Sequence, residues 1–463
     1  MIAQGRLVLE PDLLRRHDTS GPRYTSYPTA DRFVEAFDEG AYRSWLSRRG
    51  IGGMARALSL YIHIPFCSNI CFYCGCNKII TRDHGRSAKY LRHLAREAAL
   101  VDEALGGDRR LSQLHLGGGT PTFLSPEELH QLMAMVRSHF RLDEQGEYSI
   151  EIDPRSAAPG TLMLLRALGF NRMSLGVQDF DPEVQKAVNR AQGEELTRAA
   201  MEEGRAAGFR SINMDLIYGL PRQNVIEFNR TLEKVVALAP DRIALYSYAH
   251  LPQVFKPQRR IREEDLPAPE SKLHMLSLAI RRFEEAGYTY IGMDHFARPD
   301  DELAVAQRQG RLHRNFQGYS THADCDLVSL GITAIGSLGA CYVQNVRNLD
   351  DYYDLLDQGR LPVLRGLELT AEDVLRRSLI QSLMCHGAVS IESLELAHLI
   401  DFWQHFSEEI DDLRPMISDG LVELDRDWLT VTARGRLLIR SVAMVFDQYL
   451  RTRQRTAGYS KVI

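Results

Sequence analysis

The chain has 463 residues, of which 44% are hydrophobic and 25% charged, a composition typical of globular proteins. This length exceeds one ordinary hydrophobic core, so we expect two or three domains. A formal net charge of −5 gives no electrostatic reason to expect nucleic acid or an anionic membrane as a partner. The N-terminus lacks the apolar stretch of a signal peptide, and no segment has the roughly 20 apolar residues of a membrane span. We therefore expect a cytoplasmic protein, with a monomer as the default state.

The first strand-like run, Leu58–Ile64, is followed by four cysteines, Cys67, Cys71, Cys74 and Cys76. The first three are spaced C-x3-C-x2-C, and three such thiolates can bind three irons of a [4Fe–4S] cluster and leave the fourth iron open to a small molecule. Zinc bound by the four thiolates is the main alternative, and buried cysteines without a ligand are another. Disulfides are not expected, because cysteines this close together in a loop pair poorly.

Between about residues 55 and 295, short apolar runs alternate with amphipathic helical patterns. Repeated strand–helix units predict an α/β fold with a parallel sheet and right-handed crossovers, and about six units predict a partial (β/α)6 TIM-like barrel. Ligands bind such a barrel beyond the carboxyl ends of its strands. The strands that we expect after the first are Gln113–Leu116, Tyr148–Ile152, Arg172–Val177, Ile212–Ile217 and Ile243–Tyr248.

Local signals place helices between these strands. Ser125 and Glu128 form a capping box with proline at the first helical position, and Asp181 precedes a second proline in the same way. A glycine followed by an aromatic residue predicts a left-handed helix end and entry into a strand at three places. These glycines are Gly169, Gly208 and Gly287.

Polar or glycine-rich sequences follow five of the expected strands. Each alone is weak evidence, because a glycine run is usually a turn and a lone carboxylate is often solvated. On one barrel face, together, they would supply an ammonium acceptor, backbone N–H donors from the glycine run, and a carboxylate for ribose hydroxyls. A nucleoside-linked amino acid needs these groups. The sequences are Gly117–Pro121, Glu151–Pro154, Gly176–Phe180, Asp215–Pro221 and Tyr248–Pro252.

From about residue 370 the sequence predicts a mostly α-helical domain. Gly420–Thr432 reads as a hairpin, and we expect one helix from about Arg434 to Leu450, which together resemble a winged-helix unit. A packing or substrate-covering role is favoured over DNA binding, because no basic recognition face stands out. Isolated cysteines are expected to be small buried side chains. They are Cys325, Cys341 and Cys385.

The cysteine run and Gly117–Pro121 resemble those of the radical S-adenosylmethionine (SAM) enzymes. Within them, the chain is similar over nearly its whole length to the family of oxygen-independent coproporphyrinogen III oxidases. This resemblance implies oxidative decarboxylation of two propionates of coproporphyrinogen III to vinyl groups, giving protoporphyrinogen IX, by 5′-deoxyadenosyl radical chemistry. The matching segments are Gly21–Thr29, Tyr61–Cys67, Cys74–Lys78, Asp215–Pro221, His295–Leu303, Asn315–Tyr319 and Gly435–Arg440.

The resemblance also implies the residues of the site. Cys67, Cys71 and Cys74 would bind a [4Fe–4S] cluster, and Cys76 would be a catalytic residue that is not a ligand. The SAM molecule on the open iron would contact Tyr61, Gly118, Glu151 and Ile335. A second SAM molecule would lie among Tyr73, Gly119, Thr120, Gln178, Arg190, Asp215 and Ala249. The family carries Tyr-Phe between the second and third cysteines, where this chain has Phe72-Tyr73, so an aromatic residue stands at both positions but in the reverse order.

Four parts of the chain follow from the resemblance. They are an N-terminal extension covering the active site (1–54), a radical SAM barrel (55–295), a connecting segment completing the active site (296–369) and a helical C-terminal domain (370–463). A flavodoxin- or ferredoxin-like donor and an electron acceptor would be partners. Because the substrate carries several carboxylates, we expect arginines facing the cavity. The candidates are Arg23, Arg298 and Arg314.

Two other functions compete with this interpretation. The related haem chaperone shares the barrel and three cysteines, but it typically has an aromatic residue at the position of Cys76 and lacks the segment Pro22–Pro28. The second alternative is a non-enzymatic zinc or iron–sulfur protein with a winged-helix module. The presence of both enzyme markers favours the oxidase.

Overall fold

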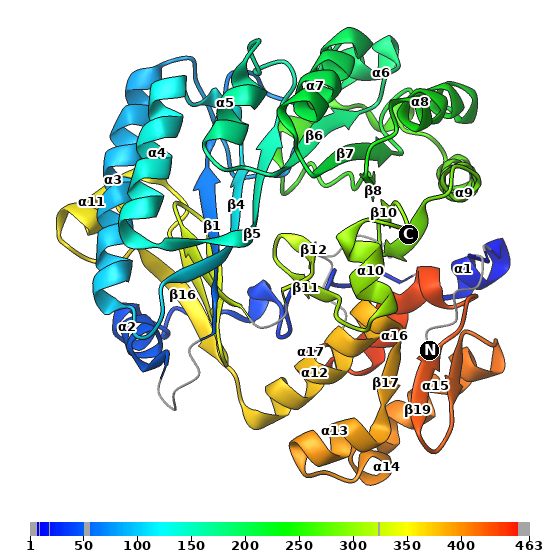
Figure 1. Cartoon of the computed structure of the whole chain (residues 1–463). Coiled ribbons are helices and arrows are strands. Elements are labelled where there is room, and N and C mark those ends of the chain that lie inside the picture. Colours follow the sequence, from blue (N-terminus) through cyan, green and yellow to red (C-terminus); the bar gives the residue numbers. More distant parts are fainter. Residues whose placement is uncertain (1–6, 9, 18, 51–55, 323–324, 452–463) are drawn as a thin grey trace. The chain divides into compact units, whose positions relative to one another are not determined.

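The computed structural model describes residues 7–8, 10–17, 19–50, 56–322 and 325–451 (Figure 1). The chain forms two compact units that alternate along the sequence. Unit 1 comprises Met1–Arg32, Pro269–Ala323 and Leu369–Ile463, and unit 2 comprises Phe33–Ala268 and Asp324–Glu368. The four expected parts stay a prediction, and the expected boundary at residues 54 and 55 lies outside the described residues.

Unit 2 is built on parallel strands that pair in the order in which they occur in the chain. On the first strand, one face is apolar and fully buried (Leu58, Leu60 and Ile62), whereas the alternate positions Ser59, Tyr61 and His63 carry polar groups. The expected α/β class with a partial barrel is therefore confirmed. These strands are β1 (Leu58–Ile64), β4 (Arg110–Gly118), β5 (Arg141–Ile152), β6 (Arg172–Gln178), β7 (Ser211–Tyr218) and β8 (Arg242–Ser247).

Helices follow these strands, and α3 and α4 lie side by side in Figure 1. The capping box is confirmed: Ser125 Oγ accepts from the Glu128 N–H at 3.2 Å, and the Glu128 carboxylate accepts from the Ser125 N–H at 2.9 Å. Gly208 ends α7 with a left-handed φ of 83°. The helices are α3 (His84–Ala104), α4 (Pro126–His139), α5 (Thr161–Ala167), α6 (Pro182–Ala187), α7 (Glu194–Ala207) and α8 (Val225–Leu238), with 3-10 turns at Pro121–Phe123, Lys256–Arg260 and Glu263–Asp265.

The segment after residue 324 extends the same sheet beyond β1, a feature that the sequence analysis did not predict. Strand β13 (Asp326–Leu330) pairs with β1 in parallel. Antiparallel strands then continue outward in the order β14 (Ile335–Leu338), β15 (Cys341–Asn345) and β16 (Val363–Glu368). Unit 2 also holds α2 (Glu39–Arg48), α11 (Leu349–Asp357) and the short parallel pair β2 (Phe66–Cys67) and β3 (Ile79–Ile80).

Unit 1 joins the N-terminal segment to the C-terminal helices around one core. Tyr24 and Tyr27 are buried among apolar residues of the C-terminal segment. The expected hairpin is present as β18 (Val422–Leu424) and β19 (Trp428–Val431), and β17 (Ala388–Ser390) pairs with β19. The other elements are α1 (Pro11–His17), a 3-10 turn at Ala30–Arg32, α9 (Pro269–Glu285), β9 (Thr289–Gly292), β10 (His295–Ala297), α10 (Glu302–Arg308), β11 (His313–Asn315), β12 (Gly318–Ser320), α12 (Ala371–His386), α13 (Ile391–His398), α14 (Phe402–His405) and α15 (Ser407–Ser418).

The single helix expected from Arg434 to Leu450 is wrong. The structure has a 3-10 turn (Arg436–Leu438), α16 (Ile439–Val445) and α17 (Gln448–Arg451) instead. The interruption follows from Asp447, whose carboxylate accepts from the Tyr24 hydroxyl at 3.0 Å and from the Tyr449 N–H at 3.0 Å. A side chain that bonds the backbone in this way competes with a continuous helix.

Two further expectations concern single features of the sequence. Cys341 and Cys385 are buried, whereas Cys325 is only partly so. In the part of the chain that the structure describes, no helix combines the length and the apolar character needed to cross a bilayer.

Candidate functional site

The cysteine loop follows β1, is hydrogen-bonded to the segment after α6, and is closed by a backbone hydrogen bond between its own two ends. The Phe72 N–H donates to the Val188 carbonyl at 2.9 Å, just beyond α6, and Asn189 Nδ2 donates to the Ile70 carbonyl at 2.7 Å. At its far end, the Ile79 N–H donates to the Pro65 carbonyl at 2.7 Å. The loop is therefore held at the carboxyl edge of the sheet, where a barrel places its ligands.

The three spaced cysteines differ in their surroundings. Burial raises the pKa of Cys67 to about 11, although its sulfur lies 3.4 Å from the Thr120 hydroxyl. A hydrogen bond with Cys76 lowers the pKa of Cys74 to about 6. Cys71 is buried, and two guanidinium groups donate to its sulfur at 3.6 Å each.

The donor set of the loop fits an iron–sulfur cluster. Its first three cysteines are close enough to influence one another's ionisation. Across the described ranges, no three His, Cys, Asp or Glu side chains are arranged to hold a single metal ion. A cubane cluster makes a different demand, since each cysteine binds a separate iron.

The glycine run does not expose backbone donors, and that expectation is wrong. The Gly118 N–H donates to Glu151 Oε2 at 3.1 Å, the Gly119 N–H to the Ile64 carbonyl at 2.8 Å, and the Thr120 N–H to the Phe66 carbonyl at 2.9 Å. Close packing against neighbouring atoms explains instead why these positions are glycine.

A β-carbon on any of the three glycines would collide with the protein itself. On Gly119 it would lie 2.7 Å from the Pro65 backbone, and on Gly118, which has a φ of +116°, 2.6 Å from the His63 ring. On Gly117 it would lie 2.9 Å from Glu151 Oε1. The run therefore lets the cysteine loop and Glu151 approach strand β4 closely.

Glu151 is an ionised carboxylate at the end of β5. Burial alone would raise its pKa, but the hydrogen bond from His115 at 3.3 Å and the Gly118 N–H hold that pKa below its ordinary value. The side chain is nevertheless 44% exposed, so part of the carboxylate is open to a ligand. This combination suits an acceptor for an ammonium group.

Tyr61 lies beside this carboxylate and is connected to the cysteine loop. Its ring stacks on His115, with centroids 5.8 Å apart and an interplanar angle of 15°. Its hydroxyl is 3.1 Å from His63 Nδ1, and His63 Nε2 is 3.1 Å from the Asn77 carbonyl. The carbonyl can only accept, so Nε2 carries the proton and Nδ1 accepts from Tyr61. The three residues form one hydrogen-bonded line.

A second carboxylate, Asp153, bridges two arginines. Its Oδ2 accepts from Arg155 at 2.6 Å and from Arg190 at 3.2 Å. Burial alone would raise the pKa of Asp153, but the bond from Arg155 and the charge of Arg190 lower it. Arg190 also donates to the Gly176 carbonyl at 2.6 Å, which fixes it against β6.

Asp215, on β7, has the opposite behaviour. Burial raises its pKa to about 6, and the nearby charge of Glu151 adds to the rise, although Ser174 Oγ donates to it at 2.8 Å. Asn213 Nδ2 donates at 2.9 Å. At slightly acidic pH, Asp153 is therefore ionised while Asp215 is largely protonated.

The remaining predicted residues lie around this group. Gln258 Nε2 donates to the carbonyls of both Tyr73 and Ala249, at 3.0 and 3.2 Å, and so joins the cysteine loop to the segment after β8. Gln178 has a left-handed φ of 71°, a strained conformation that recurs at functional sites. Ile335 begins β14, on the other side of β1 in the sheet.

Sequence reasoning missed several residues that shape the site. Arg155, His115 and Gln258 belong to none of the expected sets. His115 had one signal, since it lies on an expected strand beside Glu151. Arg155 and Gln258 had none, because their contacts join residues 84 and 185 positions apart in the chain.

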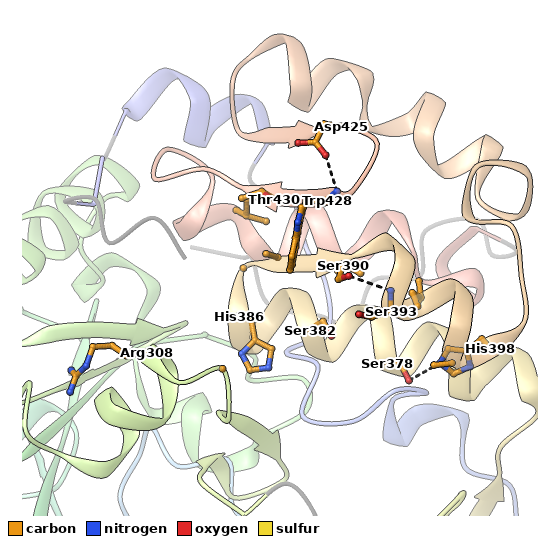
Figure 2. Close-up of a pocket in the computed structure, with 17 residues that line it drawn as sticks. Arg308, Ser378, Ser382, His386, Ser390, Ser393, His398, Asp425, Trp428 and Thr430 are labelled. Carbon is orange, nitrogen blue, oxygen red and sulfur yellow. Dashed lines mark hydrogen bonds between the residues drawn. The ribbon is translucent and has the colours of Figure 1, made fainter. Parts of the chain in front are cut away.

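Unit 1 contains a separate cavity of about 790 Å³ (Figure 2). It lies against α12, α13 and β19 and holds none of the predicted site residues. Figure 2 shows two of its local contacts: Ser390 Oγ accepts from the Ser393 N–H at 3.2 Å, and His398 lies 3.2 Å from the Ser378 hydroxyl. The polar groups of its lining are mainly hydroxyl groups and imidazole rings, with one carboxylate, Asp425, and one guanidinium, Arg308.

Two family profiles match the chain. The Radical SAM superfamily profile covers residues 61–235, which include the cysteine loop and the strand ends of β4 to β7. The HemN C-terminal domain profile covers residues 369–438 of unit 1.

Whole-length relatives are also similar. The oxygen-independent coproporphyrinogen III oxidase of Pseudomonas aeruginosa is 52% identical, with 98% of each chain covered. That of Escherichia coli is 48% identical, over 97% of this chain and 98% of the relative. A solved structure, described as coproporphyrinogen III oxidase (HemN) from E. coli, a radical SAM enzyme, superposes with a TM-score of 0.91 and 46% identity, covering 96% of this chain and 100% of that chain.

Proposed function

Because the chain belongs to the family of oxygen-independent coproporphyrinogen III oxidases, we propose that it converts two propionates of coproporphyrinogen III to vinyl groups, giving protoporphyrinogen IX. The observation that carries this proposal is the joining of the cysteine loop to the strand ends, through Cys71 with Arg190 and through Tyr73 with Gln258. Each propionate would lose a hydrogen atom, carbon dioxide and one electron.

Cys67, Cys71 and Cys74 would hold a [4Fe–4S] cluster with one iron open to SAM. Bound together, the cluster and SAM supply the radical chemistry that removes hydrogen from an unactivated carbon, which no protein acid or base can do. The protein holds the three sulfurs in one fastened loop and keeps Cys71 away from water. Cys76, an exposed residue hydrogen-bonded to the Cys74 thiol, would serve the reaction without binding iron.

Glu151 would accept the ammonium group of the SAM molecule on the open iron. Its lowered pKa keeps the carboxylate charged, and its exposed fraction leaves room for a donor. Tyr61, Gly118 and Ile335 would complete this position. A second SAM molecule would lie among Tyr73, Gly119, Thr120, Gln178, Arg190, Asp215 and Ala249.

Arg314 is the best of the three arginine candidates for a substrate carboxylate. Arg23 forms an ion pair with Asp294, and Arg298 is largely exposed and lies 3.5 Å from Asp300. Arg314 is only 3% exposed, and within the described residues its Nε and one terminal nitrogen have no hydrogen-bond partner. Two buried guanidinium nitrogens without an acceptor are costly unless a ligand supplies one.

Replacement of Arg314 tests this assignment. We expect Arg314→Lys and Arg314→Met to raise the KM for coproporphyrinogen III on the order of tenfold or more, from loss of a charge-assisted bond of about 1.5–3 kcal/mol. SAM cleavage without substrate should stay unchanged. Arg298→Met is the matched control, and an equal rise of KM in both variants would remove Arg314 from the site.

The partners of the reaction complete the proposal. A flavodoxin- or ferredoxin-like protein would deliver electrons to the cluster, and a separate acceptor would take the electrons released from the substrate. We propose a cytoplasmic monomer, in keeping with the sequence.

The decisive experiment is anaerobic incubation of the reconstituted protein with coproporphyrinogen III, SAM and dithionite, followed by chromatography of the oxidised products. We expect protoporphyrin IX together with methionine and 5′-deoxyadenosine. Cys71→Ser should yield neither porphyrin nor nucleoside product. A colourless, zinc-loaded wild-type protein that leaves SAM intact would overturn the proposal and favour a non-enzymatic metal protein.

A further inference from the structure

Cys71 differs from the other cysteines of the loop because two cationic side chains contact its sulfur. Arg155 and Arg190 each donate to Cys71 Sγ from a terminal nitrogen at 3.6 Å. Cys67 has the Thr120 hydroxyl at 3.4 Å instead. Cys74 has a single cation beside it: Lys78 Nζ lies 3.1 Å from the Cys74 carbonyl and 3.3 Å from that of Cys76, and it also hydrogen-bonds to the Cys74 thiol.

The two guanidinium groups are fixed in place. Arg155 bonds to Asp153 through Nε at 3.0 Å and through a terminal nitrogen at 2.6 Å, and Arg190 bonds to Asp153 and the Gly176 carbonyl. The side chains of Arg155 and Arg190 are 18% and 7% exposed, so water screens their charges only weakly. Asp153 cancels one of the two positive charges, and the group keeps a net charge of +1.

This arrangement has a direct consequence for a metal centre bound through Cys71. Hydrogen bonds to cluster sulfurs and the charge around a cluster set its reduction potential. Adding one electron makes the cluster more negative, so fixed cations beside one sulfur favour the reduced form. Removing a cation should lower the potential, and removing the anion between them should raise it.

We propose that Arg155 is a positioning residue that raises the reduction potential of the cluster, acting with Arg190 through the Cys71 sulfur, with Asp153 as the opposing charge. This inference depends on the proposed function, because it requires a cluster on Cys71. Arg155 is the cleaner probe of the pair, since Arg190 is also a candidate to contact a second SAM molecule.

The test is the midpoint potential of the reconstituted cluster, measured by EPR-monitored titration under anaerobic conditions without SAM or substrate. For Arg155→Gln we expect the ratio of reduced to oxidised cluster at a fixed potential to fall roughly tenfold, a shift of about 59 mV for one electron. Arg155→Lys should shift the potential less. Arg198→Gln, which removes an exposed arginine paired with Glu194, should leave the potential unchanged.

Asp153→Asn separates an electrostatic role from a structural one. It removes the negative charge and keeps the shape, so we expect a shift of similar size in the opposite direction. A loosened loop would move both variants in the same direction, and that result would overturn the proposal. If Arg155→Gln fails to bind iron, Arg155→Lys and Asp153→Asn still decide through the sign of their shifts.

The two proposals fail in different ways. If the clusters of Arg155→Gln and Asp153→Asn have the same potential as the wild-type cluster, the role of Arg155 is overturned and the proposed reaction is unaffected. If the potential shifts in the variants as expected but the wild-type protein forms no product from coproporphyrinogen III, only the proposed function is overturned. A wild-type chain that assembles no cluster would overturn both.

Discussion

The strand-edge site of unit 2 and the cavity of unit 1 are both polar, but they are built from different kinds of contact. At the strand edge, charged or sulfur-bearing groups far apart in the sequence meet: Arg190 reaches Cys71 over 119 positions. In the cavity, Ser390 bonds to the backbone three residues away, and Asp425 accepts from the backbone of Trp428. Polar groups that only complete local backbone bonds stabilise a fold, whereas ionised groups gathered from several strands mark chemistry.

The largest expected effect comes from Glu151→Gln, which tests whether the strand edge is the chemical site. The neutral amide cannot form an ion pair with an ammonium group, and losing one partner of an ion pair that a bound ligand covers costs about 2–5 kcal/mol. We expect SAM binding to weaken on the order of a hundredfold or more. Equilibrium dialysis of the reconstituted protein with labelled SAM measures this. Glu144→Gln, an exposed position on the same strand, is the control, and equal binding by both variants contradicts the assignment.

Gly118→Ala tests the close packing at the strand edge. The added carbon meets the His63 ring at 2.6 Å in a backbone conformation that favours glycine. We expect a loss of about 3 kcal/mol in the free energy of unfolding from overpacking and strain together. Gly160→Ala is the matched control, because its φ is +85° but nothing lies within 4 Å. Denaturant titration should show a clearly smaller loss of stability for the control. Equal losses would mean that backbone strain alone accounts for the effect and that the close packing against His63 contributes nothing.

Asp215→Asn tests the raised pKa of that carboxyl. In the unfolded chain the group ionises near pH 4, and in the folded protein near 6. Between these values the unfolded state releases a proton that the folded state keeps, so wild-type stability falls as the pH rises. Relative to the variant, we expect the wild-type free energy of unfolding to fall by about 2 kcal/mol between pH 4 and 7. This is less than the whole pKa shift would give, because solvent partly screens the side chain. Urea titrations across this range check the slope, and a constant difference would contradict it.

The smallest effect is expected in the cavity. Ser390→Ala removes the N-cap of α13 and should cost about 1 kcal/mol of stability. The iron content and SAM cleavage should stay unchanged, because the residue has only a local role. Ser393→Ala, whose backbone and not side chain makes the bond, is the control. A loss of SAM cleavage in Ser390→Ala would erase the contrast between the two regions.

Local pattern predicted the elements well, and tertiary contacts explain where it failed. The first strand, Leu58–Ile64, has the expected bounds because apolar residues occupy every second position along it, which is the period of a strand. The helix from Arg434 failed at Asp447, whose bond to Tyr24 joins the two ends of the chain. No periodicity within a window of 17 residues contains that information.

The same division holds within the candidate site. The cysteine spacing and Glu151 are local signals and were found. The glycine run was misread, because its N–H groups bond to Glu151, to the end of β1 and to Phe66. A sequence does not say which partner a donor takes. The pairing of Arg155 with Cys71 was invisible for the same reason.

Gln258 has a consequence for motion. Its amide donates to two carbonyls, those of Tyr73 and Ala249, and its oxygen accepts from the Leu251 N–H at 2.6 Å. One side chain thus ties the cysteine loop to the segment that follows β8, so opening of either segment breaks a hydrogen bond of the shared amide. Amide hydrogen exchange in the two segments should proceed at a common rate. Gln258→Leu should release them to exchange independently.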